Sequence, residues 1–249
     1  MKVMLTSSLG GSSKVDGVRV PSVLIQSNGQ LDRLRSLWTP NASVLIICAD
    51  PDDHEKNDSV CSCLRLSLPM SGLSISHIEK CDSRNMDAVE TLDRVDVLIL
   101  AGGHVPTQNR FMKQLCLRER LKGYSGTVVA WSAGSMNCAA TVYAGPELEG
   151  EAVDPLFERW ISGLGLTDIN IFPHYQSLKN DLLDGLRLIE DITFADSMGH
   201  DILALNDGSY IMLLDGVSVL YGEAYLIRDG EVRQICKDGG SVCLPLCDR

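Results

Sequence analysis

The sequence has no run of about 20 apolar residues, the length that a membrane-spanning helix needs. It is also poor in basic residues, with 22 Lys and Arg against 33 Asp and Glu and a formal net charge of −11. Phosphate backbones and anionic lipids repel such an acidic chain, so we expect neither nucleic acid nor a membrane surface as its partner. Residues 1–8 turn polar after five residues and lack the apolar centre of a secretion signal.

The 249 residues contain no internal repeat and no Pro-rich or Ser-rich linker, so we expect one domain over residues 1–249. Hydrophobic residues make up 45% of the chain and charged residues 22%, a balance that excludes global disorder. Without an export signal, the nine cysteines indicate reduced thiols and a cytoplasmic protein. The close pairs, Cys61 with Cys63 and Cys243 with Cys247, have no partners at zinc-ligand spacing, so no metal is predicted.

Short apolar runs alternate with longer amphipathic segments, which is typical of βα units around a parallel sheet. Several of the runs are apolar without alternation, as in strands that helices cover on both faces. Strands are predicted over residues 3–6, 43–48, 73–77, 95–100, 127–131, 169–172 and 202–205. Helices are predicted over residues 53–69, 107–122 and 181–194. After Leu205, turn pairs such as Asp215-Gly216 and Asp229-Gly230 predict antiparallel β-hairpins at the sheet edge.

Residues 128–135 read Val-Val-Ala-Trp-Ser-Ala-Gly-Ser, the form of a nucleophile elbow. A buried strand runs into Ser132, which is flanked by small residues and followed by a helix start. Such a serine projects its hydroxyl at the carboxyl end of the sheet, and the amide of Ala133 points toward a developing oxyanion. Ala130 stands where the pattern has glycine. The same residues also suit a helix N-cap serine after a core strand, and the motif alone leaves both interpretations open.

Gly102 and Gly103 follow the strand predicted at 95–100. Glycines there let a backbone amide face a site with no side chain in the way. An ordinary βα turn is the alternative. Because sites in open α/β sheets form outside the carboxyl ends of the strands, the position favours a functional role.

Five histidines could supply the base that a serine nucleophile needs. His174 follows a predicted strand and can therefore face the same rim, while His104 beside the glycine pair is the competing candidate. The others are expected to be structural, with His54 and His200 at the surface and His77 packed within a strand.

A carboxylate must orient the imidazole and stabilise its cation. Asp207 follows the strand predicted at 202–205, although Gly208 beside it also suits an ordinary turn. Glu147 and Glu149, on the loop after the elbow helix, are possible alternative acids. Four candidate elements each follow a separate strand, and that coincidence favours a site more than any one of them.

Together these stretches resemble peptidase family S51, which contains the aspartyl dipeptidases called peptidase E and the cyanophycinases. The resemblance spans about residues 95–215. It rests on Ala101-Gly102-Gly103, Ala130-Trp131-Ser132-Ala133-Gly134, Phe172-Pro173-His174-Tyr175 and Leu205-Asn206-Asp207-Gly208. The resemblance implies a flavodoxin-like α/β fold related to class I glutamine amidotransferase domains, with a mostly parallel sheet, helices on both faces and C-terminal β-hairpins.

By resemblance, Ser132 is the nucleophile, His174 the base and Asp207 the acid, and the amides of Gly103 and Ala133 form the oxyanion hole. The predicted function is a serine peptidase that hydrolyses short peptides through an acyl-enzyme, without metal or cofactor, as a monomer or homodimer. A non-catalytic binding protein of the same fold, and an esterase or amidase with the same triad, are the alternatives.

The resemblance also bears on specificity, because peptidase E reads an acidic substrate side chain with an arginine on the helix after the catalytic histidine. Between His174 and Asp207, the basic candidates are Lys179 and Arg187. The apolar spacing over residues 182–189 places Arg187 at the margin of a helical stripe, where its head reaches water. We therefore predict no strong preference for aspartate on the acyl side of the cleaved bond.

Overall fold

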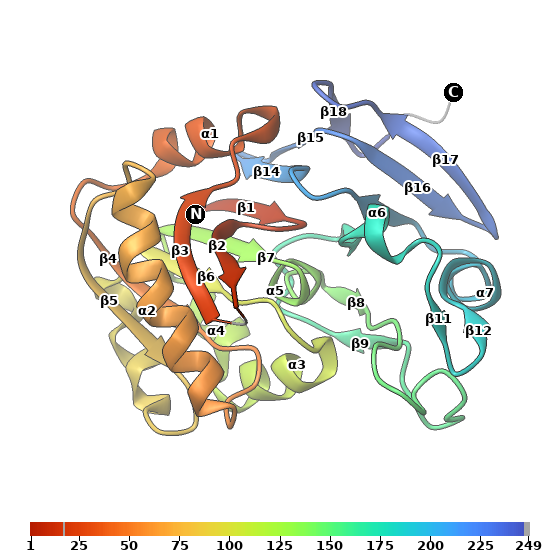
Figure 1. Cartoon of the computed structure of the whole chain (residues 1–249), viewed down its shortest axis with the longest axis horizontal. Coiled ribbons are helices and arrows are strands. Elements are labelled where there is room, and N and C mark those ends of the chain that lie inside the picture. The colour runs from red at the N-terminus through yellow and green to blue at the C-terminus, as the bar shows by residue number, and fades with distance from the viewer. Residues whose placement is uncertain (17, 247–249) are drawn as a thin grey trace.

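The central sheet of the protein has eight strands in the order β18-β15-β14-β1-β7-β6-β4-β5 (Figure 1). The computed structural model describes residues 1–16 and 18–246. In sheet order, the strands are β18 (Ser241–Leu244), β15 (Val217–Tyr221), β14 (Tyr210–Leu214), β1 (Lys2–Thr6), β7 (Thr127–Trp131), β6 (Val97–Leu100), β4 (Ala42–Ile47) and β5 (Ile75–Cys81). The strands from β1 to β5 pair in parallel, whereas those from β1 to β18 pair antiparallel.

The parallel half has the strand order of a doubly wound sheet. Counted along the chain from β4, the four strands β4, β5, β6 and β7 lie in the order 2-1-3-4, which is the order of flavodoxin. Strand β1 takes the fifth place, beside β7. The mostly parallel α/β sheet predicted from the sequence is therefore confirmed.

Helices cover both faces of this sheet because successive strand residues point to opposite sides. Val97 and Ile99 of β6 pack with the helices α1 (Gln30–Leu37) and α2 (His54–Met70). Leu98 and Leu100 of the same strand pack in the other cluster. That cluster includes residues of the 3₁₀ helix η2 (Met86–Arg94) and of α3 (Val105–Gln114), α4 (Leu117–Leu121) and α5 (Ala133–Met136).

A second sheet of four strands lies beside the first, in the order β10-β13-β16-β17. Its strands are β10 (Asn170–Phe172), β13 (Ile202–Leu205), β16 (Ala224–Arg228) and β17 (Glu231–Cys236), and Figure 1 places it next to the short helix α6 (Tyr175–Leu178). Three two-stranded sheets complete the fold: β2 (Gly10–Val15) with β3 (Val18–Leu24), β8 (Thr141–Tyr143) with β9 (Trp160–Ser162), and β11 (Leu182–Leu183) with β12 (Leu186–Arg187).

The C-terminal hairpins are confirmed, with a division that the sequence did not predict. Asp215-Gly216 and Asp229-Gly230 have positive φ at both positions, as two-residue hairpin turns require. The first turn extends the central sheet, whereas the second builds the second sheet. The strands predicted at 169–172 and 202–205 also belong to the second sheet.

The helix predicted over 181–194 is wrong in its first half. Asp184 and Gly185 take positive φ values of 54° and 80°, so the chain turns there and forms the hairpin of β11 and β12. Helical turns start only after that hairpin, as η3 (Leu188–Thr193) and α7 (Phe194–Asp196). The leucines in this segment have the spacing of a helix, but the Asp-Gly pair forms a turn that a helix cannot contain.

Smaller differences concern boundaries and single residues. The helix predicted over 107–122 starts earlier, at Val105, and is broken at Cys116, which has a φ of 50°. Asp53 caps α2, accepting a hydrogen bond from the amide of Lys56. The helices α1 and η2 and the β2–β3 hairpin were not predicted.

Two further observations concern chemistry in the described part of the chain. No helix within it is long and apolar enough to cross a membrane. Its eight cysteines form no disulfide, and Cys247 of the pair with Cys243 lies outside the described residues.

Candidate active site

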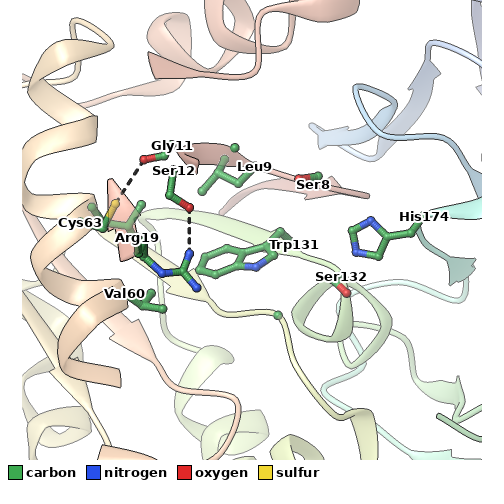
Figure 2. Close-up of a pocket in the computed structure, with 13 residues that line it drawn as sticks. Ser8, Leu9, Gly11, Ser12, Arg19, Val60, Cys63, Trp131, Ser132 and His174 are labelled. Atoms are coloured by element: carbon green, nitrogen blue, oxygen red, sulfur yellow. Dashed lines mark hydrogen bonds between the residues drawn. The ribbon is translucent and has the colours of Figure 1, made fainter. Parts of the chain in front are cut away.

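The residues predicted to follow four separate strands lie around one rim. Gly102 and Gly103 follow β6, Ser132 follows β7, His174 follows β10 and Pro173, and Asp207 follows β13 after one intervening residue. Ser132 and His174 line the same two pockets, and Figure 2 shows the His174 ring on the side toward Ser132. The structure therefore brings the two residues together from two different sheets.

Ser132 has the strained backbone of a nucleophile elbow. Its φ of 52° and ψ of −123° lie where residues other than glycine are rare, between the end of β7 and the start of α5. The amide of Ser132 donates to the carbonyl of Thr6 at 3.1 Å, which ties the turn to β1. The buried hydroxyl of Ser135, one helical turn on, bonds both the amide and the carbonyl of Thr6. The elbow is thus held on β1 from both ends.

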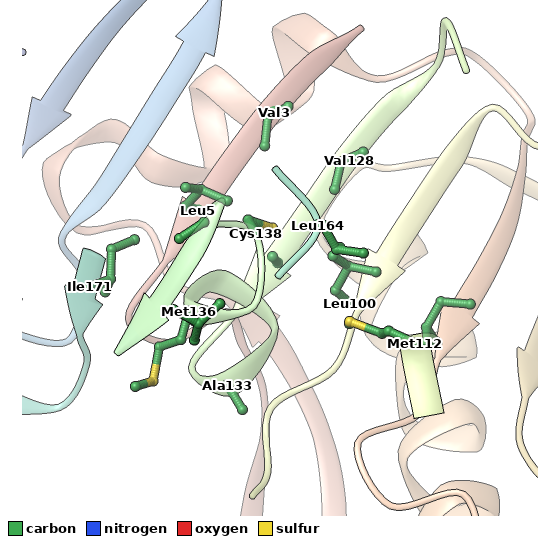
Figure 3. Close-up of a cluster of buried hydrophobic side chains, with 14 of the residues drawn as sticks. Val3, Leu5, Leu100, Met112, Val128, Ala133, Met136, Cys138, Leu164 and Ile171 are labelled. Atoms are coloured by element: carbon green, nitrogen blue, oxygen red, sulfur yellow. The ribbon is translucent and has the colours of Figure 1, made fainter. Parts of the chain in front are cut away.

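Close packing explains the small residues around the elbow. A Cβ at Gly134 would collide with the carbonyl oxygen of Leu100, so only glycine fits there. On the other side, a Cβ at Gly102 would lie 2.5 Å from the indole nitrogen of Trp131. Figure 3 shows Ala133 and Met136 of α5 beside the strand cluster that contains Leu100. These contacts hold the start of α5 against the strand ends.

His174 is positioned by its own backbone and by Asp207. It has a left-handed conformation, with φ 57° and ψ 28°, directly before α6. Its Nδ1 lies 2.7 Å from Oδ1 of Asp207. Since that contact engages Nδ1, Nε2 is the ring nitrogen left to face the pockets.

Ser7, which was not predicted, connects the two residues of this pair. Its buried hydroxyl accepts a hydrogen bond from the amide of His174 at 2.8 Å and donates to Oδ1 of Asp207 at 2.9 Å. Burial alone would raise the pKa of Asp207, but the hydrogen bond and charge of His174, with help from Ser7, hold the pKa below its usual value. Asp207 is therefore ionised at neutral pH.

Ser7 follows β1, at the same rim as the residues that were found. Sites in open α/β sheets form outside the carboxyl ends of the strands, the criterion that predicted Ser132, His174 and Asp207, and Ser7 also meets it. A serine after a short N-terminal strand carries no motif, however, so no local pattern favours Ser7 over Ser8.

The amide groups of Gly103 and Ala133 are available for a ligand. Over residues 1–16 and 18–246, neither N–H donates a hydrogen bond to another residue. Ala133 is the first residue of α5, where backbone N–H groups lack intrahelical partners. A Cβ at Gly103 would lie 2.5 Å from the Cβ of Ala49, so glycine is needed there for packing as well as for access.

His104, the competing base, is engaged at both ring nitrogens. Nδ1 lies 2.8 Å from Oγ1 of Thr107, and Nε2 lies 2.9 Å from Oε1 of Glu151. His104 does not line either pocket at Ser132. The structure thus separates the two candidate histidines by their partners.

The other histidines lie away from Ser132. His54 bonds the hydroxyl of Ser83, and His200 is exposed and stacks on Trp160 at 4.0 Å between ring centroids. His77, predicted to pack within a strand, is instead exposed on β5, at the edge of the central sheet.

The alternative acids do not bond His174 in the described structure. Glu147 and Glu149 are both exposed residues, and the carboxyl group of Glu147 accepts from the amide of Val105 at 3.2 Å. Desolvation, with the nearby charge of Glu151, raises the pKa of Glu147 to about 7, although Val105 and His174 oppose the rise. Glu147 lines one of the pockets at Ser132, together with the titratable groups His174 and Asp181.

Two pockets flank the pair of Ser132 and His174. The first, called here the hairpin pocket, has a volume of about 300 Å³ and lies under the β2–β3 hairpin, with Arg19, Val60 and Trp131 in its lining. The second, the loop pocket, has a volume of about 260 Å³ and is lined largely by apolar residues together with Glu147 and Asp181. Both are small for ligand pockets, which suits a small substrate.

No metal cluster is found among the residues with described positions, where no three His, Cys, Asp or Glu side chains could hold an ion.

The fold and this rim define an α/β protein with a strained strand-to-helix turn at Ser132. A model of peptidase family S51 matches residues 9–220, so the chain belongs to peptidase family S51. This membership supports a hydrolase that acts on peptides.

Comparison with solved structures agrees with this fold. A crystal structure described as a "Putative Peptidase E Protein" from Listeria monocytogenes EGD-e is similar to the chain, with a TM-score of 0.52 and 17% sequence identity. The match covers 94% of this chain and 97% of that one. No curated protein matches the chain.

Proposed function

We propose that this protein is a serine peptidase that hydrolyses short peptides through an acyl-enzyme. The observation that carries the proposal is the arrangement at the rim, where the strained elbow holds Ser132 beside His174 and Asp207 bonds the far nitrogen of the ring. The site lies within what we propose to be one domain over residues 1–249. Two small pockets on either side of Ser132 favour short substrates over folded proteins.

In this mechanism, Ser132 attacks the peptide carbonyl while Nε2 of His174 takes the hydroxyl proton. Asp207 stays ionised and stabilises the imidazolium. The amides of Gly103 and Ala133 donate to the oxyanion of the tetrahedral intermediate. His174 then returns the proton to the leaving amine. Water next attacks the acyl-enzyme while His174 takes its proton, and His174 passes that proton to the oxygen of Ser132 as the carboxylic acid product leaves.

A fluorophosphonate probe tests the nucleophile directly. We expect covalent labelling of Ser132, detected by mass spectrometry, and no labelling in Ser132→Ala. If Ser132 stays unlabelled while a control serine hydrolase reacts, the chain is instead a non-catalytic binding protein. If Ser132 is labelled but only esters or simple amides are turned over, the esterase or amidase alternative is correct.

The structure also bears on the predicted lack of preference for aspartate. Arg187 is exposed on β12, where its guanidinium bonds Asp191 at 2.6 Å and 2.9 Å, and it does not line either pocket at Ser132. We therefore propose that dipeptides matched except on the acyl side are cleaved with less than a hundredfold preference for aspartate. A larger preference that Arg187→Ala abolishes would contradict this.

A further inference from the structure

The hairpin pocket contains a cation that the mechanism above does not use. We propose that Arg19, on β3, binds a carboxylate of the substrate in this pocket. The proposal rests on the proposed function, because it assigns a recognition group to the same site. Of the described residues that line the pocket, Arg19 alone is permanently charged.

The guanidinium of Arg19 is held in place but not neutralised. Nη1 donates to the hydroxyl of Ser12 at 2.8 Å across the hairpin, and the residue is half-buried (Figure 2). No carboxylate of the described chain lies within ion-pair distance of it. Nε and Nη2 therefore remain available as donors, which is enough for two parallel hydrogen bonds to a carboxylate.

Several other described arginines also lack a carboxylate partner but donate to backbone carbonyls, as Arg33, Arg65 and Arg118 do, and others form ion pairs. In a protein with 33 acidic and 22 basic residues, carboxylates are in excess. Arg35 pairs with Asp32, Arg84 with Asp58 and Asp82, and Arg187 with Asp191. A pocket arginine without a carboxylate is available to an anionic group brought by a ligand.

The hairpin that carries Arg19 is fixed to α2. The carbonyl of Gly11 accepts from Sγ of Cys63 at 3.4 Å and from the hydroxyl of Ser67. Gly11 has a φ of 83°, and a Cβ there would lie 2.7 Å from the side chain of Leu24. These contacts hold the base of the hairpin over the pocket. The hydrogen bond to Ser12 restrains the guanidinium itself, which lowers the entropic cost of binding.

Trp131 indicates which carboxylates fit. Figure 2 shows its indole between Arg19 and the pair of Ser132 and His174, within the same pocket. A carboxylate bound by Arg19 therefore lies beyond the residue that carries the cleaved carbonyl. Two sources meet this condition, the free C-terminal carboxylate of a short peptide and an acidic side chain that points away from Ser132.

Calorimetric titration of Ser132→Ala, which cannot form an acyl-enzyme, tests the proposal without turnover. The ligands are trialanine, trialanine amide, and the same amide with glutamate in the middle position. We expect at least one carboxylate-bearing peptide to bind about 10- to 100-fold more tightly than trialanine amide, the range for a charge-assisted hydrogen bond. Tighter binding of trialanine identifies the C-terminal carboxylate, and tighter binding of the glutamyl amide identifies a side chain.

Adding Arg19→Gln should abolish this difference, while Arg19→Lys should keep part of it because the charge remains without the planar fork. Arg187→Gln is the matched control and should leave the difference intact. Equal binding of all three peptides, no binding of any, or a difference that survives Arg19→Gln would overturn the proposal.

The proposed function fails separately, through an unlabelled Ser132 in the wild-type chain. Carboxylate binding that depends on Arg19, found together with an unlabelled Ser132, would leave the Arg19 assignment standing in a protein without turnover.

Discussion

Two pairs of a histidine and a carboxylate lie near the carboxyl ends of the strands, and only one of them is open. His174 and Asp207 are 31% and 38% exposed at their side chains, whereas His104 and Glu151 are 18% and 17% exposed. The distances within the pairs are similar, at 2.7 Å and 2.9 Å. The pairs differ at the other nitrogen of each imidazole ring. In His104 this nitrogen bonds Thr107, whereas in His174 it bonds no described residue.

The comparison teaches that a carboxylate partner does not by itself make a histidine a base. The His104 pair instead joins the start of α3 to the loop around residue 151, since Glu151 also accepts from the amides of Glu147 and Leu148. The His174 pair leaves one nitrogen for a substrate, beside a serine on an elbow. Substitutions in the two pairs should separate these roles.

The largest expected difference is between the two histidines. His174→Ala and Ser132→Ala should each lower kcat/KM on the order of 10³-fold or more, and together hardly more than either alone, because they act as a unit. His104→Ala should change kcat/KM by less than about fivefold, because its ring does not face Ser132. Steady-state kinetics on one peptide with all the variants measures this. A crippled His104→Ala with an active His174→Ala would reverse the assignment.

The carboxylates should differ next. Asp207→Asn should lower kcat about 10²- to 10³-fold, since the ring loses its fixed orientation and the charge that stabilises its cation. Glu151→Gln, the matched change in the other pair, should lower kcat by less than about fivefold. A neutral Asp207→Asn beside an inactive Glu149→Ala or Glu147→Ala would show that the loop supplies the acid.

A smaller difference is expected between the hydroxyls that support the pairs. Ser7→Ala should lower kcat about tenfold and the free energy of unfolding by about 1–2 kcal/mol, because it removes a buried donor to Asp207 and an acceptor for the amide of His174. Thr107→Ala removes the corresponding hydroxyl of the closed pair and should affect stability alone. Chemical denaturation and kinetics on both variants test this, and equal losses of kcat would contradict it.

The smallest effect concerns Glu147. Its carboxyl group bonds the amide of Val105 at the start of α3, beside the pair of His104 and Glu151, and it lines the loop pocket together with His174. Its pKa is raised to about 7 from 4.5, so the folded protein holds this proton more tightly than the unfolded chain. The protonated Glu147 side chain therefore contributes to the free energy of unfolding in full below pH 4.5, and this contribution is lost as the pH rises through 7. Glu147→Gln should remove about 1 kcal/mol of this pH dependence, since water screens part of the interaction. Identical profiles of unfolding free energy against pH for both proteins would contradict the raised pKa.

Much of the fold could be predicted because its signals are local. The unbroken apolar runs at 44–47 and 97–100 mark strands buried on both faces, and Asp-Gly pairs mark the C-terminal hairpin turns. The assignment of strands to sheets could not be predicted, because both β10 and β1 are short apolar runs and only long-range packing separates them. The error at 181–194 had a local cause, since Asp184-Gly185 was a turn signal inside a leucine pattern.

In the candidate site, too, the residues with a local motif could be predicted and those that depend on long-range contacts could not. Ser132 and Gly134 have a motif of their own, because the close approach to Leu100 restricts the residues that fit. His174 and Asp207 could be proposed from strand ends, although their hydrogen bond depends on the second sheet. Ser7 and Arg19 depend on contacts across the fold, which no neighbouring residue in the sequence reveals.

The hydrogen bond between Ser7 and Asp207 joins residues 200 positions apart, and it links the site to the order of synthesis. A chain still on the ribosome with residues 1–200 exposed has Ser132 and His174 but neither Asp207 nor β14, which pairs with the second edge of β1. Domains fold as units during synthesis, so the rim forms only after Asp207 and β14 have emerged. Until those residues have emerged, the edge of β1 that pairs with β14 is open, and an unpaired strand edge is a template for pairing with other chains.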